Sequence, residues 1–135
     1  MVDTLIHMDR ELDRRGLWAF TQIAWGHCQP SPLQPEWYMA AICDFLAEPS
    51  LLRVINVPPT TGKSTLSGVF WPAWVWTTDP QTAWQYVSYD IDLLNRDTEQ
   101  LIKLVRSDWY VSRWGERLPK GKIGVSQFET LQGGG

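Results

Sequence analysis

The sequence has few cysteines, no long apolar run and no secretory leader. Its two cysteines, Cys28 and Cys43, form no C-x-x-C unit, so a disulfide framework is not expected and a reducing, intracellular setting is the simpler expectation. The longest apolar stretch, GVFWPAWVW at residues 68–76, is far shorter than the roughly 20 residues that span a bilayer. The mixed-charge start, MVDTLIHMDRELDRRG, lacks the form of a signal peptide. We therefore expect neither a membrane span nor secretion.

Basic charge is also scarce. The 135 residues carry 12 Lys and Arg against 15 Asp and Glu, a formal net charge of −3, and no basic block suits a nucleic-acid backbone. The length fits one domain. Nine tryptophans are many for such a chain, and their bulk must be buried, paired or placed at an interface. For Trp71, Trp74 and Trp76 we favour core packing, with a partner surface as the alternative.

Apolar spacing predicts helices in three regions. The first covers residues 3–26, with a break near Gly16, and is followed by a proline-rich linker, GHCQPSPLQP. The second begins at Pro35 and ends before Pro49, with an apolar face of Tyr38, Ala41, Ile42 and Phe45. The third is capped by Asp90, with an apolar face of Ile91, Leu94, Leu101, Ile102 and Val105.

Three further segments read as strands, at residues 51–57, 82–89 and 123–128. The first is a short β-branched apolar run, typical of a strand covered on both faces. A helix is expected to follow residue 63 and to end or kink at Pro72, because proline lacks the N–H that a helix interior needs. This alternation predicts an α/β fold with a parallel sheet and flanking helices.

The stretch VINVPPTTGKST, residues 54–65, joins the first predicted strand to a predicted helix. In the phosphate-loop pattern G-x-x-x-x-G-K-[ST], backbone N–H groups surround the β-phosphate, the lysine reaches the β- and γ-phosphates, and the hydroxyl holds Mg²⁺. Gly62, Lys63 and Ser64 fill those places, whereas Val57 stands where the first glycine belongs. The competing interpretation is an exposed turn with a solvated lysine.

With its flanking segments, this stretch resembles the N-terminal ATPase region of tailed-phage terminase large subunits, the motors that package viral DNA. The resemblance covers about residues 30–135 and rests on the order and spacing of short motifs: Pro58, Pro59, Gly62, Lys63 and Ser64, then Trp71, Pro72 and Trp74, then Ser88, Tyr89 and Arg96. It implies a P-loop NTPase-type sheet, incomplete at the C-terminus, with an N-terminal helical segment and linker at residues 1–34 and a partial ATPase domain at residues 35–135.

The resemblance also implies ATP and Mg²⁺ as cofactors, Lys63 as the catalytic residue and Ser64 as the Mg²⁺ ligand. The implied nucleotide-binding residues are Pro59, Thr60, Thr61, Gly62, Lys63, Ser64 and Thr65. For the full-length protein, the implied partners are viral DNA, the portal protein, the small terminase subunit and further copies of the motor subunit, with no membrane. The implied compartment is the cytoplasm of an infected or lysogenic bacterium.

Two departures from the family pattern limit the expected chemistry. Thr60 and Thr61 occupy the gap in which many members carry an arginine, and Arg53 and Arg96 are candidates to replace it, although a solvated surface charge is the favoured interpretation of each. No acidic pair follows an apolar run, and the nuclease domain is absent, so we expect ATP binding without efficient hydrolysis. The alternatives are another P-loop NTPase, such as a helicase or small kinase, and a non-catalytic remnant.

A metal site at His27, Cys28 and Cys43 is the remaining chemical hypothesis. Their spacing matches no structural zinc pattern. Two small buried thiols and a loop histidine are therefore the preferred interpretation.

Overall fold

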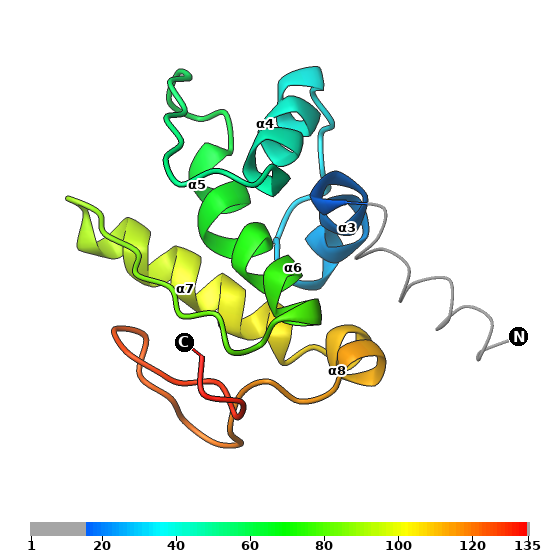
Figure 1. Ribbon diagram of the computed structural model, residues 1–135, viewed down its shortest axis with the longest axis vertical. Coiled ribbons are helices and arrows are strands. Elements are labelled where there is room, and N and C mark those ends of the chain that lie inside the picture. The colour runs from blue at the N-terminus through cyan, green and yellow to red at the C-terminus, as the bar shows by residue number, and fades with distance from the viewer. Residues whose placement is uncertain (1–15, 135) are drawn as a thin grey trace, which may run out of the picture.

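The computed structural model describes residues 16–134, and the regular structure within them is helical (Figure 1). In chain order the helices are α3 (Leu17–Ala24), η1 (Trp25–His27), α4 (Trp37–Ala47), α5 (Lys63–Thr65), η2 (Leu66–Phe70), α6 (Trp71–Thr78), α7 (Ile91–Val105) and α8 (Asp108–Trp114). No β-strand occurs in this part of the chain, so the predicted α/β fold with a parallel sheet is wrong. The first half of the helix predicted at residues 3–26 lies outside the described residues.

The three segments predicted as strands are not paired with one another. Among residues 16–134, no backbone hydrogen bond joins any two of the segments 51–57, 82–89 and 123–128. A strand is stabilised by ladder bonds and by cover for its apolar side chains, and both are lacking here. The large exposed apolar residues of the first two segments are Leu51, Leu52, Val54, Tyr86, Val87 and Tyr89.

The centre of the molecule is one continuous helical run, residues 63–78, made of α5, η2 and α6. Proline at position 72 was predicted to end or kink this helix, yet the run continues past it. A proline ring clashes with the carbonyl four residues earlier in a regular α-helix. Here the helix widens into a π-turn just before the proline, with the Trp71 N–H bonded to the Leu66 carbonyl five residues back. The wider turn lets the chain pass Pro72 without ending.

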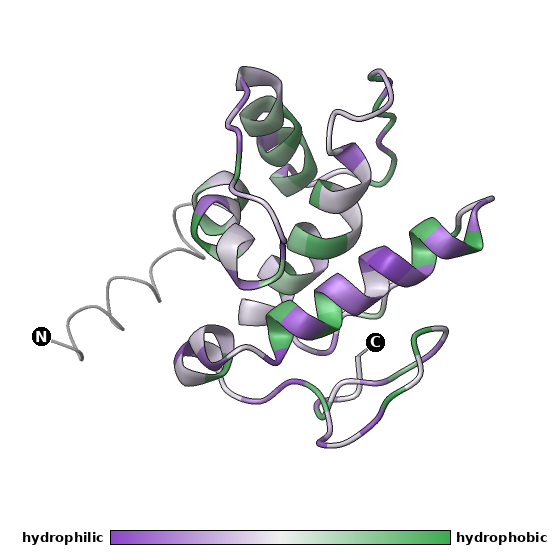
Figure 2. Ribbon diagram, turned by 180° about the vertical axis from the view of Figure 1, so that it is seen from behind, coloured by the Kyte–Doolittle hydropathy of each residue, from purple (hydrophilic) through white to green (hydrophobic). Residues whose placement is uncertain are grey.

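The helix α7 begins as predicted, with Asp90 as its N-cap. The Asp90 carboxylate accepts hydrogen bonds from the N–H groups of Asp92, at 2.9 Å, and Leu93, at 3.3 Å. Figure 2 shows apolar and polar residues in alternating bands along this helix, typical of an amphipathic helix. Its C-terminal half is buried through Leu101, Leu104 and Val105, whereas the predicted contact residue Ile91 is exposed.

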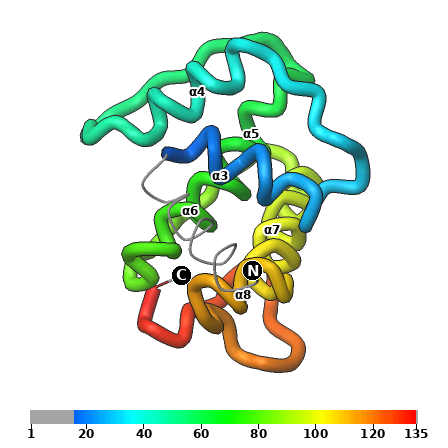
Figure 3. Tube along the Cα trace, turned by 90° about the vertical axis from the view of Figure 1, so that its right-hand side faces the viewer, coloured from blue at the N-terminus to red at the C-terminus, as the bar shows by residue number. Residues whose placement is uncertain are grey.

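Helices from both ends of the chain pack around the central run. α3 and α4 contact it and each other, and α7 also contacts it. Figure 3 shows α4 at one end of the molecule and α8 with the C-terminal loop at the other. The loop is held to α6 by a hydrogen bond from Arg117 Nε to the Trp76 carbonyl, at 2.9 Å. The helix predicted from Pro35 is confirmed as α4. Of its predicted apolar face only Ile42 is buried, and the other buried residues of the helix are Met39, Cys43 and Leu46.

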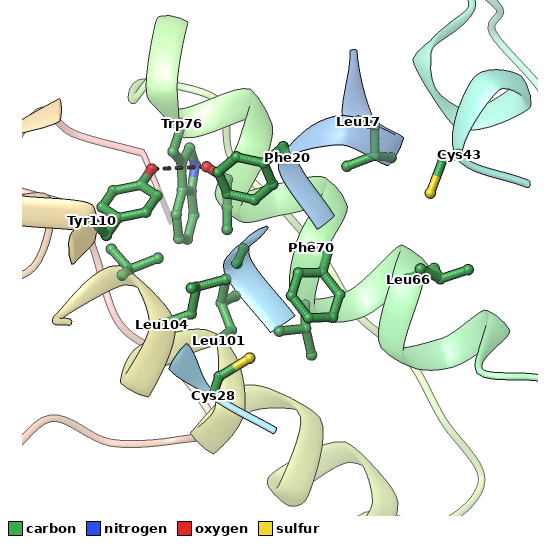
Figure 4. Packing of buried hydrophobic residues seen from close by; sticks show 14 of the residues in the cluster. Leu17, Phe20, Cys28, Cys43, Leu66, Phe70, Trp76, Leu101, Leu104 and Tyr110 are labelled. Atoms are coloured by element: carbon green, nitrogen blue, oxygen red, sulfur yellow. Dashed lines mark hydrogen bonds between the residues drawn. The ribbon is translucent and has the colours of Figure 1, made fainter. Parts of the chain in front are cut away.

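The core lies between these helices and is rich in aromatic rings (Figure 4). Phe20 from α3, Phe70 from η2, Trp76 from α6 and Tyr110 from α8 are fully buried, together with Leu104 from α7. The Tyr110 hydroxyl donates to the Ala73 carbonyl at 2.8 Å, so the one polar atom of this ring is satisfied. The predicted core role is thus confirmed for Trp76. In residues 16–134, no helix has the length and apolar character needed to cross a membrane.

Candidate phosphate-binding site

The predicted phosphate loop forms a tight turn in front of the central helical run. Thr60 has φ 66° and Gly62 has φ 80°, so both lie in the left-handed region. Glycine adopts this conformation readily, whereas a β-branched threonine is strained there. Side-chain hydrogen bonds hold the turn, from Thr60 Oγ1 to the Pro59 carbonyl at 2.6 Å and from Thr61 Oγ1 to the Pro58 carbonyl at 2.9 Å. Backbone strain of this kind occurs mainly at functional sites.

Three consecutive N–H groups follow the turn and precede the helical ladder. The first helical bond runs from the Leu66 N–H to the Gly62 carbonyl, at 2.9 Å. The N–H groups of Lys63, Ser64 and Thr65 therefore have no partner within the helix, and no side chain caps them. Successive N–H groups at the positive end of a helix form a favourable environment for an anion.

The Lys63 ammonium is folded back over this turn. Its Nζ donates a hydrogen bond to the Val57 carbonyl at 2.9 Å, which ties the two ends of the loop together. Lys63 is half-buried, and its ammonium is held at the Val57 carbonyl rather than extending into solvent. The ammonium and the uncapped N–H groups thus belong to the same short segment.

A buried carboxylate network lies between α7 and the central helical run. Asp97, whose side chain is 1% exposed, accepts from Arg96 Nη2 at 2.9 Å and from the Tyr86 hydroxyl at 3.2 Å. Partial burial raises the pKa of the Tyr86 phenol, the Asp97 charge raises it further, and contact with the Ser64 side chain lowers it. The Tyr86 hydroxyl therefore ties the segment before α7 to the buried carboxylate of that helix.

The protein offers one hydroxyl, that of Ser64, at the position where the motif places a Mg²⁺ ligand. Mg²⁺ prefers oxygen ligands, keeps several waters and is often held partly by the phosphates of a substrate. The half-buried Ser64 hydroxyl, in the first turn of the helical run, supplies one such oxygen. Among residues 16–134, no cluster of three or more His, Cys, Asp or Glu side chains is placed to hold a metal.

The two candidate arginines have different environments. Arg53 donates to the carbonyls of Phe45 and Ser50, at 3.1 and 3.0 Å, and its guanidinium lies 5.4 Å from the centre of the Trp71 ring. It fastens the segment after α4 to the central helix. Arg96 is engaged with Asp97, although half of its side chain is exposed. The sequence led us to expect a solvated surface charge at both positions. Instead, each guanidinium is held by hydrogen bonds to the protein.

A cavity of about 510 Å³ lies next to the loop but does not include it. It is bounded by the central run, α7, the segment around Tyr86 and the C-terminal loop, and its residues nearest the phosphate loop are Ser67 and Gly68. The pocket is therefore separate from the free N–H groups.

Cys28 and Cys43 are buried as free thiols, as predicted. Burial raises the pKa of Cys28 to about 11 and that of Cys43 to about 12. His27 stacks on the Trp109 ring, with ring centres 4.8 Å apart. Thiols that hold their protons so firmly are poor metal ligands.

The structure places the predicted nucleotide-binding residues in one turn, and it brings Tyr86 and Asp97 together beside the central run, which the sequence did not suggest. Residues 59–65 form the turn and the start of the helix. Tyr86 and Asp97 were missed, because Tyr86 is eleven positions from Asp97 and more than twenty from the loop. One signal was available: Asp97 interrupts the apolar stripe of Leu94, Leu101 and Leu104 on α7. A carboxylate on a buried helix face needs a partner.

The local geometry is a helix start with uncapped N–H groups, a lysine tied back to the loop and a half-buried serine. Comparison of the chain with family models, with curated proteins and with solved structures finds no match in any of the three. The functional argument therefore rests on the residues of the chain itself.

Proposed function

We propose that residues 59–65 bind the phosphates of ATP, with Mg²⁺. The observation that carries this proposal is the turn at Thr60 and Gly62, which is followed by three uncapped N–H groups and is closed by the bond from Lys63 Nζ to the Val57 carbonyl. A turn that served only as a connection has no need of a strained threonine, which costs about 1–3 kcal/mol.

Each residue of the loop has a defined role in this proposal. The N–H groups of Lys63, Ser64 and Thr65 donate to phosphate oxygens, and Lys63 Nζ exchanges the Val57 carbonyl for an oxygen of the β- or γ-phosphate. The Ser64 hydroxyl holds Mg²⁺, which neutralises phosphate charge when bound. Hydrolysis by these residues alone is slow, because no carboxylate is free beside the loop to orient water: Asp97 is engaged by Arg96 and Tyr86.

The order of the motifs along the chain extends the proposal to a class of ATPase. We propose an ATPase of the terminase large-subunit type, acting with viral DNA, the portal protein, the small terminase subunit and further copies of itself in the cytoplasm of a bacterial host. This proposal is supported by the spacing of the sequence motifs and by the geometry of the loop at residues 59–65. It has no support from the fold, because residues 16–134 form no sheet. Sequencing the reading frame beyond Gly135 tests it: a nuclease-type cluster of carboxylates is expected, whereas helicase motifs there would contradict it.

Calorimetric titration of ATP with Mg²⁺ tests the phosphate site. Replacing Lys63 by alanine removes a charge-assisted bond worth about 1.5–3 kcal/mol, so we expect affinity to fall about ten- to a hundredfold. Lys122→Ala, at an exposed position on the C-terminal loop, is the matched control and should bind as the wild type does. The proposal fails if the wild type does not bind ATP, or if Lys63→Ala binds equally well.

A further inference from the structure

We infer that the cavity next to the loop receives the adenine ring of the nucleotide whose phosphates bind at residues 59–65. This inference rests on the proposed function, because it assigns a place to the other half of the same ligand. The volume of the cavity, about 510 Å³, falls within the roughly 300–1,000 Å³ of pockets that take small molecules.

The walls of the cavity are aromatic. Trp71 and Trp84 line it and pack edge to face, with ring centres 4.9 Å apart and ring planes at 70°. Trp76 and Phe128 also line it, at 6.3 Å and 79°. In an edge-to-face pair, one ring keeps both of its faces clear of its partner. Open aromatic faces favour a flat ring system that stacks on them, so the ligand expected here is planar and aromatic.

The charge of the lining distinguishes the ring of a nucleotide from its phosphates. Among residues 16–134, the one charged side chain that lines the cavity is Glu129. Its carboxylate repels a phosphate but accepts a hydrogen bond from an amino group. Residues 59–65 have the opposite character, with a lysine and no aromatic ring. The cavity therefore suits a neutral, amino-bearing ring, and the loop suits the anionic end of the same molecule.

Two backbone segments offer hydrogen bonds to the edge of such a ring. Residues 83–86 and 125–129 both line the cavity. In the described part of the chain, their N–H and C=O groups form no backbone hydrogen bond. Small-molecule pockets commonly use backbone groups of this kind to orient a ligand. These segments therefore carry donors and acceptors for the ring nitrogens and the amino group of adenine.

The two parts of the proposed site are close together on the central run. Ser67 lines the cavity, and its hydroxyl donates to the Ser64 carbonyl at 3.4 Å. Residues three apart lie on the same side of a helix, and three residues correspond to about 4.5 Å along its axis. The ribose and the α-phosphate of a nucleotide join the ring to the β-phosphate across such a separation.

The loop that forms the outer wall of the cavity is fastened at both ends. Arg117 Nε donates to the Trp76 carbonyl at 2.9 Å before the lining residues. The buried Thr130 hydroxyl donates to the Pro80 carbonyl at 2.8 Å after most of them. The cavity is therefore formed before a ligand arrives, as is usual for a small-molecule site.

The test compares the affinities of the protein for ATP, tripolyphosphate and adenosine by calorimetry. Stacking of a base on aromatic rings should make ATP bind about five- to a hundredfold more tightly than tripolyphosphate. Trp84→Leu should lower ATP affinity by about fivefold or more and leave tripolyphosphate affinity unchanged, whereas a variant that only weakens the fold would lower both. Trp37→Leu, at an 81% exposed tryptophan on α4, is the matched control and should bind all three ligands as the wild type does.

A second variant keeps the test decisive if Trp84 is needed for folding. Ala83 is exposed and lines the cavity, so Ala83→Phe adds bulk there without removing a core side chain, and it should weaken ATP and adenosine but not tripolyphosphate.

The outcomes separate this inference from the proposed function. A folded Ala83→Phe protein that binds ATP as the wild type does would overturn the inference alone, as would a wild type that binds tripolyphosphate as tightly as ATP. A wild type that binds adenosine and gains nothing from the triphosphate would overturn the proposed function and support the cavity. A wild type that binds none of the three would overturn both.

Discussion

Replacing Gly62 by alanine tests whether the left-handed backbone of the loop is required. Gly62 has φ 80° and ψ 5°, a conformation that costs an L-residue about 1–2 kcal/mol. Alanine also restricts the unfolded chain, which offsets about 0.4–1 kcal/mol of that cost. The new Cβ would lie 3.5 Å from Met39 Cε, an ordinary contact, so no clash adds to the loss. We expect the free energy of unfolding to fall by about 1 kcal/mol.

Thermal and urea unfolding followed by circular dichroism measure this change. A loss of 1 kcal/mol corresponds to a decrease in Tm of about 4 °C for a chain of this size. Gly26→Ala is the matched control, because no atom lies within 4 Å of its Cβ position and its φ is not positive. Gly26→Ala should therefore be neutral or slightly stabilising.

Measuring ATP affinity distinguishes an effect of Gly62→Ala on the loop from an effect on the stability of the whole fold. If Gly62→Ala forces the turn to a negative φ, the N–H groups of Lys63 and Ser64 rotate away from a shared anion, and ATP affinity should fall with stability. A Gly62→Ala protein that is as stable as Gly26→Ala and binds ATP as the wild type does would refute the argument that this backbone conformation forms the site.

Two further predictions concern the rest of the fold. Asp90→Ala removes the cap bonds to the N–H groups of Asp92 and Leu93. It should lower the free energy of unfolding, measured by urea denaturation, by about 1 kcal/mol. An equally large decrease in Asp92→Ala, at an exposed position, would argue against capping as the cause. Burial raises the pKa of Cys28 to about 11 and of Cys43 to about 12 from 9.0, so the stability that their protonated thiols give should be complete below pH 9 and lost as the pH rises through those values. The alkaline loss of unfolding free energy should be smaller in the Cys28→Ala, Cys43→Ala double variant, and an equal loss would contradict this assignment.

Local signals in the sequence predicted the helices α4 and α7 and the start of the central run, but not α8 (Asp108–Trp114), and they predicted the buried faces less well. The cap at Asp90 acts through adjacent backbone, so it is visible in a short stretch of sequence. In α4, the predicted stripe beginning at Tyr38 and the observed stripe beginning at Met39 have the same spacing. Periodicity alone does not choose between two apolar stripes one residue apart, because the choice depends on which helix packs against them.

The strands were mispredicted for a different physical reason. Val54, Ile55 and Val57 have high β propensity, but propensity in strands mostly reflects packing against neighbouring strands. With no ladder partner in the described part of the chain, the segment stays unpaired and Val54 stays exposed. The sequence of a single segment therefore does not determine whether another strand is available to pair with it.

The candidate site likewise has a part that the sequence predicted and a part that depends on tertiary packing. Residues 59–65 are contiguous, so the sequence was sufficient to gather them, and the left-handed turn at Gly62 agrees with the glycine in the motif. Tyr86 and Asp97 come together beside the central helix only through the packing of α7 and its preceding segment. Their contribution depends on tertiary structure and was not predictable from motif spacing.

The π-turn at Leu66–Phe70 also determines how the residues before it are rotated about the helix axis relative to the buried residues after it. One extra residue in a helical turn rotates everything before it by about 100° relative to everything after it. Residues 63–65 therefore face a different direction from the one that the apolar stripe of Trp71–Thr78 would impose on a regular helix. The direction of the turn at residues 59–62 thus depends on the number of residues between Lys63 and Pro72. Deleting one of them would rotate the turn relative to the core while leaving the sequence of the turn intact.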